Sequence, residues 1–371
     1  MQALKEFIKQ ETVLVIAMIL AIVSMFFVAP DSGYAGYIDY QTLALLFCLM
    51  IIMCKLQKMG VFHTIGVKLL QKVNGSRQLY AALVLLCFFS SMLITNDVAL
   101  ITFVPFAITV LKMAGLEHRM IPVVVLQTVA ANLGSMVTPI GNPQNLYLYG
   151  QSGMSLGSFI MLMLPYAAIA AVIFALMIMR MKNQNVDTTA LQTMDAPKIN
   201  VDRDLIIYMA LFLGCVLAVA KILPWQAMLI VVGAVTVKND ASILKNVDYS
   251  LLLTFVAFFV FSGNMSRIDA VRDLFSMLLE KSTLIFSVLS CQIISNVPTA
   301  ILLSQFTNNY HELLIGVNIG GVGTIIASLA SLITLREFQK HYPKKIKSYF
   351  VEFSGINFAF LFILTLSALF Y

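Results

Sequence analysis

Two short stretches decide the fold of this protein: residues 92–103 read MLITNDVALITF, and residues 292–303 read QIISNVPTAILL. Each places a polar tripeptide inside an apolar run, TND at 95–97 and SNV at 295–297. A helix that crosses a bilayer tolerates broken or polar backbone at mid-depth only where protein or a polar cavity surrounds it. Neither run is therefore expected to be a simple membrane span.

The remainder of the chain has the composition of a polytopic membrane protein. Of its 371 residues, 60% are hydrophobic and 11% charged, whereas roughly a quarter of an average soluble domain is charged. If the two interrupted runs are re-entrant helical hairpins, nine full crossings remain. The apolar stretches, hairpins included, are 12–29, 40–54, 79–112, 120–149, 157–181, 204–223, 225–237, 249–264, 283–304, 312–335 and 349–371.

The basic residues orient these nine crossings. With the N-terminus in the cytoplasm and the C-terminus outside, 20 of the 24 lysines and arginines lie inside, and the outer ones are Lys221, Arg267, Arg272 and Lys281. Such a bias is what the positive-inside rule requires. The net charge of +6 is therefore assigned to orientation and not to nucleic-acid binding. The five cysteines form no CxxC pair, so neither a disulfide framework nor a transition-metal site is expected.

The order of apolar and polar segments predicts five parts. The basic N-terminus followed by an apolar stretch is read as a retained first span, not as a cleaved signal peptide. A polar, Pro-containing segment separates two halves and is expected to be a cytoplasmic linker. The parts are 1–39 (first transmembrane helix and outer loop), 40–181 (first repeat), 182–203 (linker), 204–238 (scaffold helices) and 249–371 (second, inverted repeat).

A second pair of stretches indicates an internal repeat. Residues 132–145 read NLGSMVTPIGNPQN and align without gaps with NIGGVGTIIASLAS at 318–331, which matches Asn132, Gly134 and Thr138 to Asn318, Gly320 and Thr324. An amphipathic stretch precedes each hairpin, Lys55–Lys72 and Ser266–Lys281, and each is expected to lie along an interface.

The number of crossings between the repeats indicates that they are inverted. The chain crosses an odd number of times between 40–54 and 249–264, so the second half is inserted upside down, as in many secondary transporters. The competing interpretation is that glycine and asparagine in these helices only permit close helix packing.

The hairpin tips are the expected binding sites. At each tip one helix ends with unpaired carbonyls, which suit a cation, and another begins with unpaired amides, which suit an anion. Asp97 is the only carboxylate deep in an apolar stretch, and it needs a compensating proton or cation unless it is simply a helix cap. Val297 stands at the matching position of the second tip, so the two sites are not chemically equivalent.

The two aligned stretches are expected to differ in how far they unwind. Residues 138–145 contain two prolines, a glycine and four polar side chains, and a helix cannot continue through them. The counterpart, 324–331, lacks proline and is expected to be only mildly unwound. The first half is therefore expected to form the tighter cation site.

The combination of ITNDVAL, ANLGSMVTPIGNPQN and ISNVPTAILL resembles the ion transporter superfamily, which includes divalent-anion/sodium symporters, arsenite permeases and sodium/proton antiporters. The likeness runs from about residue 40 to near the end and is closest to the short bacterial inner-membrane anion permeases. It implies that the tips bind substrate and that sodium lies between each tip and the adjacent unwound helix. The resemblance carries these roles onto Thr95, Asn96, Ser295 and Asn296 at the tips, and onto Gly134, Thr138, Asn142, Gly320 and Thr324 in the unwound segments. With the neighbouring residues added, the expected substrate-binding residues are Thr95, Asn96, Asp97, Ser295, Asn296 and Thr299. The expected cation-binding residues are Asn96, Asp97, Gly134, Thr138, Gly141, Asn142, Asn296, Gly320 and Thr324.

The sequence departs from the dicarboxylate carriers of that superfamily, because Asp97 and Val297 stand where they have threonine. Asp97 would repel an anion unless it is protonated, which argues against a dicarboxylate.

The sequence favours one function and leaves two alternatives open. The expected function is secondary transport of a small anion, a carboxylate or inorganic oxyanion, coupled to Na⁺ or H⁺ and with no other cofactor. Sodium/proton antiport or arsenite efflux, with Asp97 as the proton site, is the alternative within transporters, and an ion channel is the alternative outside them. An enzyme is not expected, since no HExxH or GxSxG occurs. The expected location is the bacterial inner membrane in contact with lipid, and a homodimer is left open.

Overall fold

Helices form all the regular structure in the residues that the computed structural model describes, which are 11–184, 199 and 202–370. Apolar runs become helices because a helix pairs its backbone groups within one segment. Six are long and apolar enough to cross a membrane: α3 (Tyr40–Lys58), α6 (Asn96–Met113), α9 (Leu156–Arg180), α12 (Trp225–Asp240) with η3 (Ala241–Asn246), α13 (Tyr249–Ser266), and α19 (Ile346–Phe370) with η4 (Pro343–Lys345).

The expected nine crossings do not all appear as single long helices. A seventh span is counted only if α14 (Asp269–Lys281) and α15 (Thr283–Ile294), which are bent by 119°, are taken as one. Five of the six are expected crossings, and α6 belongs to the first expected hairpin, as α15 belongs to the second. The other four expected crossings are short or divided, so the nine-crossing topology stays a prediction. They are α2 (Thr12–Met25), α11 (Arg203–Val219), α7 (Met120–Ser135) with α8 (Pro143–Ser152), and α17 (Tyr310–Ile319) with α18 (Leu329–His341).

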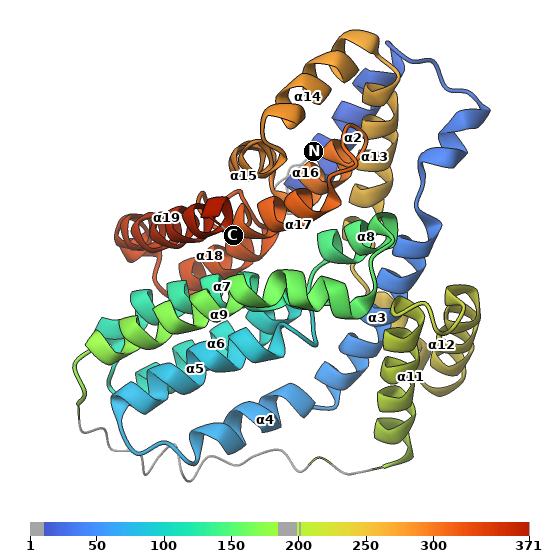
Figure 1. Cartoon of the computed structure of the whole chain (residues 1–371). Helices are drawn as coiled ribbons and strands as arrows, with labels where there is room; N and C mark the ends of the chain where they lie inside the picture. The colour runs from blue at the N-terminus through green and yellow to red at the C-terminus, as the bar shows by residue number, and fades with distance from the viewer. Residues whose placement is uncertain (1–10, 185–198, 200–201, 371) are drawn as a thin grey trace.

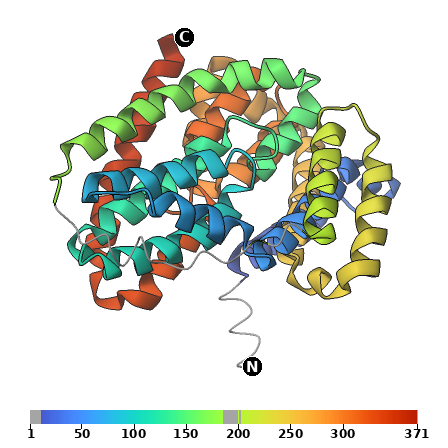
Figure 2. The same cartoon turned by 90° about the horizontal axis from the view of Figure 1, so that it is seen from below.

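The helices gather in two groups. Helices α2, α3, α11, α12 and α13 pack together on one side of the molecule and are called the scaffold group. The hairpin group comprises α5 (Ser76–Ser90), α6 to α9, α15, α16 (Asn296–Leu303) and α17 to α19 (Figures 1 and 2). The arm helices, α4 (Val61–Leu70) and α14, join the two groups at opposite ends of the molecule (Figure 1).

Each interrupted run folds as two packed helices joined at its polar tripeptide. Helix α5 ends at Ser90 and α6 starts at Asn96, while α15 ends at Ile294 and α16 starts at Asn296. Thr95 caps α6 by accepting a hydrogen bond from the backbone N–H of Val98. These are the helix pairs expected from the sequence, and their re-entry on one side of a membrane stays a prediction.

The second broken helix is more unwound than the sequence indicated. The first break covers 136–142 and the second covers 320–328, so the expectation of mild unwinding in the second half was wrong. In the second break, glycines interrupt the helix where the first break has prolines. Gly320 and Gly321 follow the end of α17, and Gly323 adopts a φ of +120°, which disfavours any other residue.

Two expected segments do not coincide with single described elements. The amphipathic stretch Lys55–Lys72 is divided, because its first four residues complete the last turn of α3 and only Val61–Leu70 forms the arm. Most of the predicted linker, 185–198 and 200–201, lies outside the described residues. The five-part division therefore stays a prediction.

Candidate functional site

The N-termini of four helices meet at one small void between the two hairpin tips. Its volume is about 10 Å³, which is room for about one water molecule. No lysine or arginine is among the lining residues. These are Asn96 and Asp97 at the start of α6, Pro143 and Gln144 at the start of α8, Asn296 and Val297 at the start of α16, Ser328 and Leu329 at the start of α18, and Leu251 of α13.

Both tips are attached to the broken helices by the same hydrogen bonds. The backbone N–H of Asn96 donates to the carbonyl of Gly141 (3.0 Å), and that of Asn296 donates to the carbonyl of Ala327 (2.9 Å). In each tip the side-chain oxygen of the asparagine accepts from the next backbone N–H, at 3.0 Å and 2.9 Å. The asparagine thus fixes the first turn of the second hairpin helix.

A second matched contact fastens each hairpin to its broken helix. The hydroxyl of Thr138 donates to the carbonyl of Met92, and the hydroxyl of Thr324 donates to the carbonyl of Gln292 (3.0 Å). Both carbonyls belong to the end of the first hairpin helix or the turn after it. The two threonines satisfy backbone groups that the helix end would otherwise leave unpaired, and their oxygen lone pairs stay available to a cation.

The two halves are also linked by a crossed pair of amide and hydroxyl contacts. Asn142, which caps α8, donates to the side-chain oxygen of Asn318 in α17 (3.2 Å). Ser328, which precedes α18, donates to the side-chain oxygen of Asn132 in α7 (3.0 Å). Asn318 in turn donates to Asn145 (2.6 Å). In each broken helix, the residue just before the second helical segment therefore hydrogen-bonds to the first helical segment of the broken helix in the other half.

One donor in this network has no protein partner. Asn132 is 4% exposed, and its Nδ2 atom makes no hydrogen bond, although its oxygen accepts from Asn96 (3.0 Å) and from Ser328. A buried amide without an acceptor costs free energy. The structure thus leaves one buried donor unsatisfied next to Asn96 of the first tip.

The predicted cation-site glycines lie where helices approach closely. A Cβ atom on Gly134 would overlap the carbonyl oxygen of Phe88, and one on Gly320 would lie 2.8 Å from the Cβ of Cys291. A Cβ atom on Gly141 would overlap the backbone carbonyl of Ser135, the last residue of α7. Packing is sufficient to explain these three glycines, and nothing here tests their role as cation ligands.

Some of the predicted site residues line the void, and others do not. Asn96, Asp97 and Asn296 line the void. Thr95, Ser295 and Thr299 do not: Thr95 caps α6, and the Thr299 hydroxyl donates to the Ser295 carbonyl (2.7 Å). Ser295 has a φ of +75°, a strained value for a residue with a side chain.

Two polar lining residues were missed by the sequence analysis, Gln144 and Ser328. The signal for Ser328 was present, because the gapless alignment of the two stretches places it opposite Asn142. Gln144 lies in the proline-containing stretch that the sequence marked as broken. Nothing in its identity separated it from its neighbours.

Broken helices that meet at a polar point inside an apolar bundle are typical of permeases. The relatives agree. The chain is 34% identical over 305 residues to an uncharacterized transporter of Methanocaldococcus jannaschii, covering 81% of each protein. It is 30% identical over 314 residues to the inner membrane protein YbiR of Escherichia coli, covering 83% of this chain and 82% of the relative. A silicon efflux transporter of rice, LSI3, is 33% identical over 138 residues, 37% of this chain and 28% of its own length.

The protein is therefore a membrane transporter and not an enzyme. Residues 7–311 match the citrate transporter family, CitMHS, and the chain belongs to that family. This agrees with the wider superfamily to which the sequence motifs pointed.

Proposed function

We propose that this protein is a secondary active transporter that carries a small anion, a carboxylate or inorganic oxyanion, across the membrane with Na⁺ or H⁺. The observation that carries the proposal is the meeting of four helix N-termini at one void. Each N-terminus carries roughly half a positive charge from its helix dipole, and at the two tips the first backbone N–H groups are already hydrogen-bonded within the protein. Together the four N-termini attract an anion without any lysine or arginine.

Asp97 is the proposed site of the coupling ion. Its carboxylate is the only one among the lining residues, and it offsets the positive potential of the helix ends. A sodium ion or proton at Asp97 removes that negative charge, and the anion then binds. The proposed cation ligands are the ones expected from the sequence, and they are supported by the free lone pairs of Thr138 and Thr324 beside the tips.

Alternating access is the proposed mechanism, based on inverted repeats. Support comes from the matched tip contacts of Asn96 and Asn296 and from the crossed contacts between the halves. A void of about 10 Å³ is too small for a carboxylate. The site must therefore open, and we propose that the hairpin group moves against the scaffold group, exposing the site to each side of a bacterial inner membrane in turn.

The names of the family and of one relative suggest the first compounds to test. The family is named for citrate and the rice relative for silicon efflux, and neither compound is assigned to this chain. The second candidate function is sodium/proton antiport or arsenite efflux. It is favoured by one observation, a single carboxylate at the tip that is able to carry a proton.

The test is a thermal-shift screen of the purified protein against carboxylates including citrate, sulfate, phosphate, silicate and arsenite, each with and without sodium and at two pH values. We expect at least one anion to stabilise the protein more strongly when Na⁺ or H⁺ is abundant. Uptake of that anion into proteoliposomes should collapse when an ionophore dissipates the cation gradient. Sodium-driven proton movement with no stabilising anion would instead support antiport, and flux that an ionophore does not affect would support a channel.

Replacement of either tip asparagine by alanine is expected to weaken binding of the stabilising anion at least about tenfold, because a hydrogen bond to a charged ligand contributes about 1.5–3 kcal/mol. Asn96→Ala and Asn296→Ala should behave alike, since the two residues occupy matching positions. Calorimetric titration measures the affinity. Asn308→Ala, at an exposed position, is the matched control. Normal affinity in either tip variant would remove that tip from the binding site.

A further inference from the structure

The scaffold helices α3 and α13 each pass into an arm helix through a basic residue that is paired with a distant aspartate. Lys58 is the last residue of α3, and its Nζ lies 2.9 Å from Oδ2 of Asp240. Arg267 directly follows α13, and its Nη2 lies 2.7 Å from Oδ2 of Asp31. A cation at the C-terminal end of a helix also interacts favourably with the helix dipole.

The two pairs occupy matching positions in the two halves of the chain. Asp240 lies as many positions after Asp31 in the sequence as Arg267 lies after Lys58. The same spacing separates Asp39 from Asp248, the residues whose carboxylates cap the starts of α3 and α13.

Two further contacts beside these ion pairs keep the same spacing. The Tyr37 ring packs against Gly263, where a Cβ would overlap it, and the thiol of Cys54 lies 3.4 Å from the carbonyl of Asn246. Asn246 lies as many positions after Tyr37, and Gly263 as many after Cys54, as Asp240 lies after Asp31. The correspondence thus covers the whole junction and not only its charged residues.

Each pair joins one half of the chain to the other. Asp31 follows α2, which packs along α13, while Asp240 ends α12, which packs along α3. The arm helices α14 and α4 lie at opposite ends of the molecule (Figure 1), and each pair lies at the scaffold-helix end from which its arm departs. We call them the Asp31 clasp and the Asp240 clasp.

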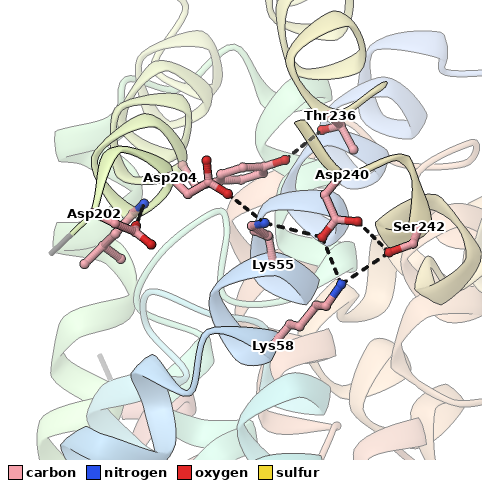
Figure 3. A network of polar contacts seen from close by, with 9 residues as sticks. Lys55, Lys58, Asp202, Asp204, Thr236, Asp240 and Ser242 are labelled. Carbon is pink, nitrogen blue, oxygen red and sulfur yellow. Dashed lines mark hydrogen bonds and ion pairs between the residues drawn. The ribbon is translucent and has the colours of Figure 1, made fainter. Parts of the chain in front are cut away.

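Further hydrogen bonds hold each carboxylate in place. In the Asp240 clasp, Lys55 and Ser242 also bind Asp240, and Lys55 lies 2.9 Å from Asp204 of α11 (Figure 3). In the Asp31 clasp, the backbone N–H of Gly33 donates to Asp31 (2.9 Å), and Arg267 donates to the hydroxyl of Tyr37 (3.0 Å). The hydrogen bond from Arg267 lowers the pKa of Asp31 below its usual value, so this carboxyl is charged at neutral pH.

Stability alone does not explain the Asp31–Arg267 pair, whereas the Asp240 clasp is more buried, with the side chains of Asp240 and Lys55 18% and 9% exposed. The side chains of Asp31 and Arg267 are 44% and 43% exposed, and exposed ion pairs contribute little to the free energy of folding. The pair Arg272–Asp269 (2.6 Å) shows the ordinary alternative, a contact between neighbours on one arm helix. The clasps instead connect separate elements at the point where the chain changes direction.

We propose that the Asp31 and Asp240 clasps are positioning devices that set the angles at which the arm helices α14 and α4 leave the scaffold group. Each clasp controls the arm at its own end. The proposal goes beyond the proposed function, since it holds whatever ion or substrate is carried.

Electron spin resonance distance measurements in lipid nanodiscs test it. Spin labels at Leu253→Cys in α13 and Leu274→Cys in α14 report on the arm α14. Labels at Leu253→Cys and at Ile65→Cys in α4 report on the arm α4. All three positions are exposed (54%, 49% and 48%), and Cys54 is replaced by serine because the other four cysteines are buried. We expect Asp31→Asn to broaden or shift only the first distance distribution and Asp240→Asn only the second.

Controls separate positioning from stability. Arg272→Ala should leave both distributions unchanged, and the charge exchange Asp31→Arg with Arg267→Asp should restore the first. Asp31→Asn should keep a thermal unfolding midpoint within about 3 °C of the starting protein, because its ion pair is exposed. Unchanged distributions in both Asp31→Asn and Asp240→Asn, or equal broadening of both distances by either substitution, would overturn the proposal.

Discussion

Replacement of Asp97 by asparagine is expected to abolish the dependence of binding and transport on the coupling ion. Asp97 lies in the first turn of α6 and lines the void between the tips, where no lysine or arginine is available to neutralise it. A carboxylate at the centre of a membrane helix costs about 2.5–3.5 kcal/mol, and a bound cation recovers that cost. The amide needs no cation, so cation affinity should fall roughly a hundredfold, at about 1.4 kcal/mol for each factor of ten.

The measurement is the thermal stabilisation by sodium, and by acidic pH, of the wild-type protein and the Asp97→Asn variant. Asp273→Asn, at an exposed position on α14, is the matched control and should respond like the wild type. Asparagine has nearly the shape of aspartate, so the variant should fold. A normal sodium or pH response in Asp97→Asn would show that the residue only caps the helix.

Gly134→Ala is expected to have the largest effect on folding. The added methyl group would overlap the carbonyl oxygen of Phe88 and would press on the Ser91 hydroxyl. The Phe88 oxygen belongs to the backbone and cannot turn away, and the Ser91 hydroxyl is hydrogen-bonded to that same oxygen. Overpacking of this kind typically costs 1–3 kcal/mol and occasionally more, so we expect a loss of at least about 3 kcal/mol and little monodisperse protein.

Gly233→Ala is the control for that experiment. Gly233 lies in α12, and nothing lies within 4 Å of the position that its Cβ would occupy. Alanine favours a helix over glycine by about 1 kcal/mol, so this variant should be as stable as the wild type or slightly more so. Size-exclusion chromatography and thermal unfolding compare the two variants. Equal stability of Gly134→Ala and Gly233→Ala would mean that α7 and the first hairpin are not packed as described.

Much of the candidate site was predictable because polar residues seldom interrupt an apolar stretch, and each interruption here covers only a few residues. The tripeptides at 95–97 and 295–297 marked the two helix junctions, and the aligned stretches marked both broken helices. These features depend on backbone preferences within a few residues, which the sequence expresses directly. The extent of the second break was misjudged, because glycines unwound it without proline.

The sequence by itself determined the membrane class, the helix pairs and the positions of Asn96 and Asn296. Only the tertiary structure decided how the halves cross. The bonds of Asn142 to Asn318 and of Ser328 to Asn132, and the ion pair of Asp31 with Arg267, join residues far apart in the chain. Local sequence preferences do not specify such partners, because an asparagine or arginine looks the same in the sequence whichever distant residue it contacts. The packing of one half against the other selects them.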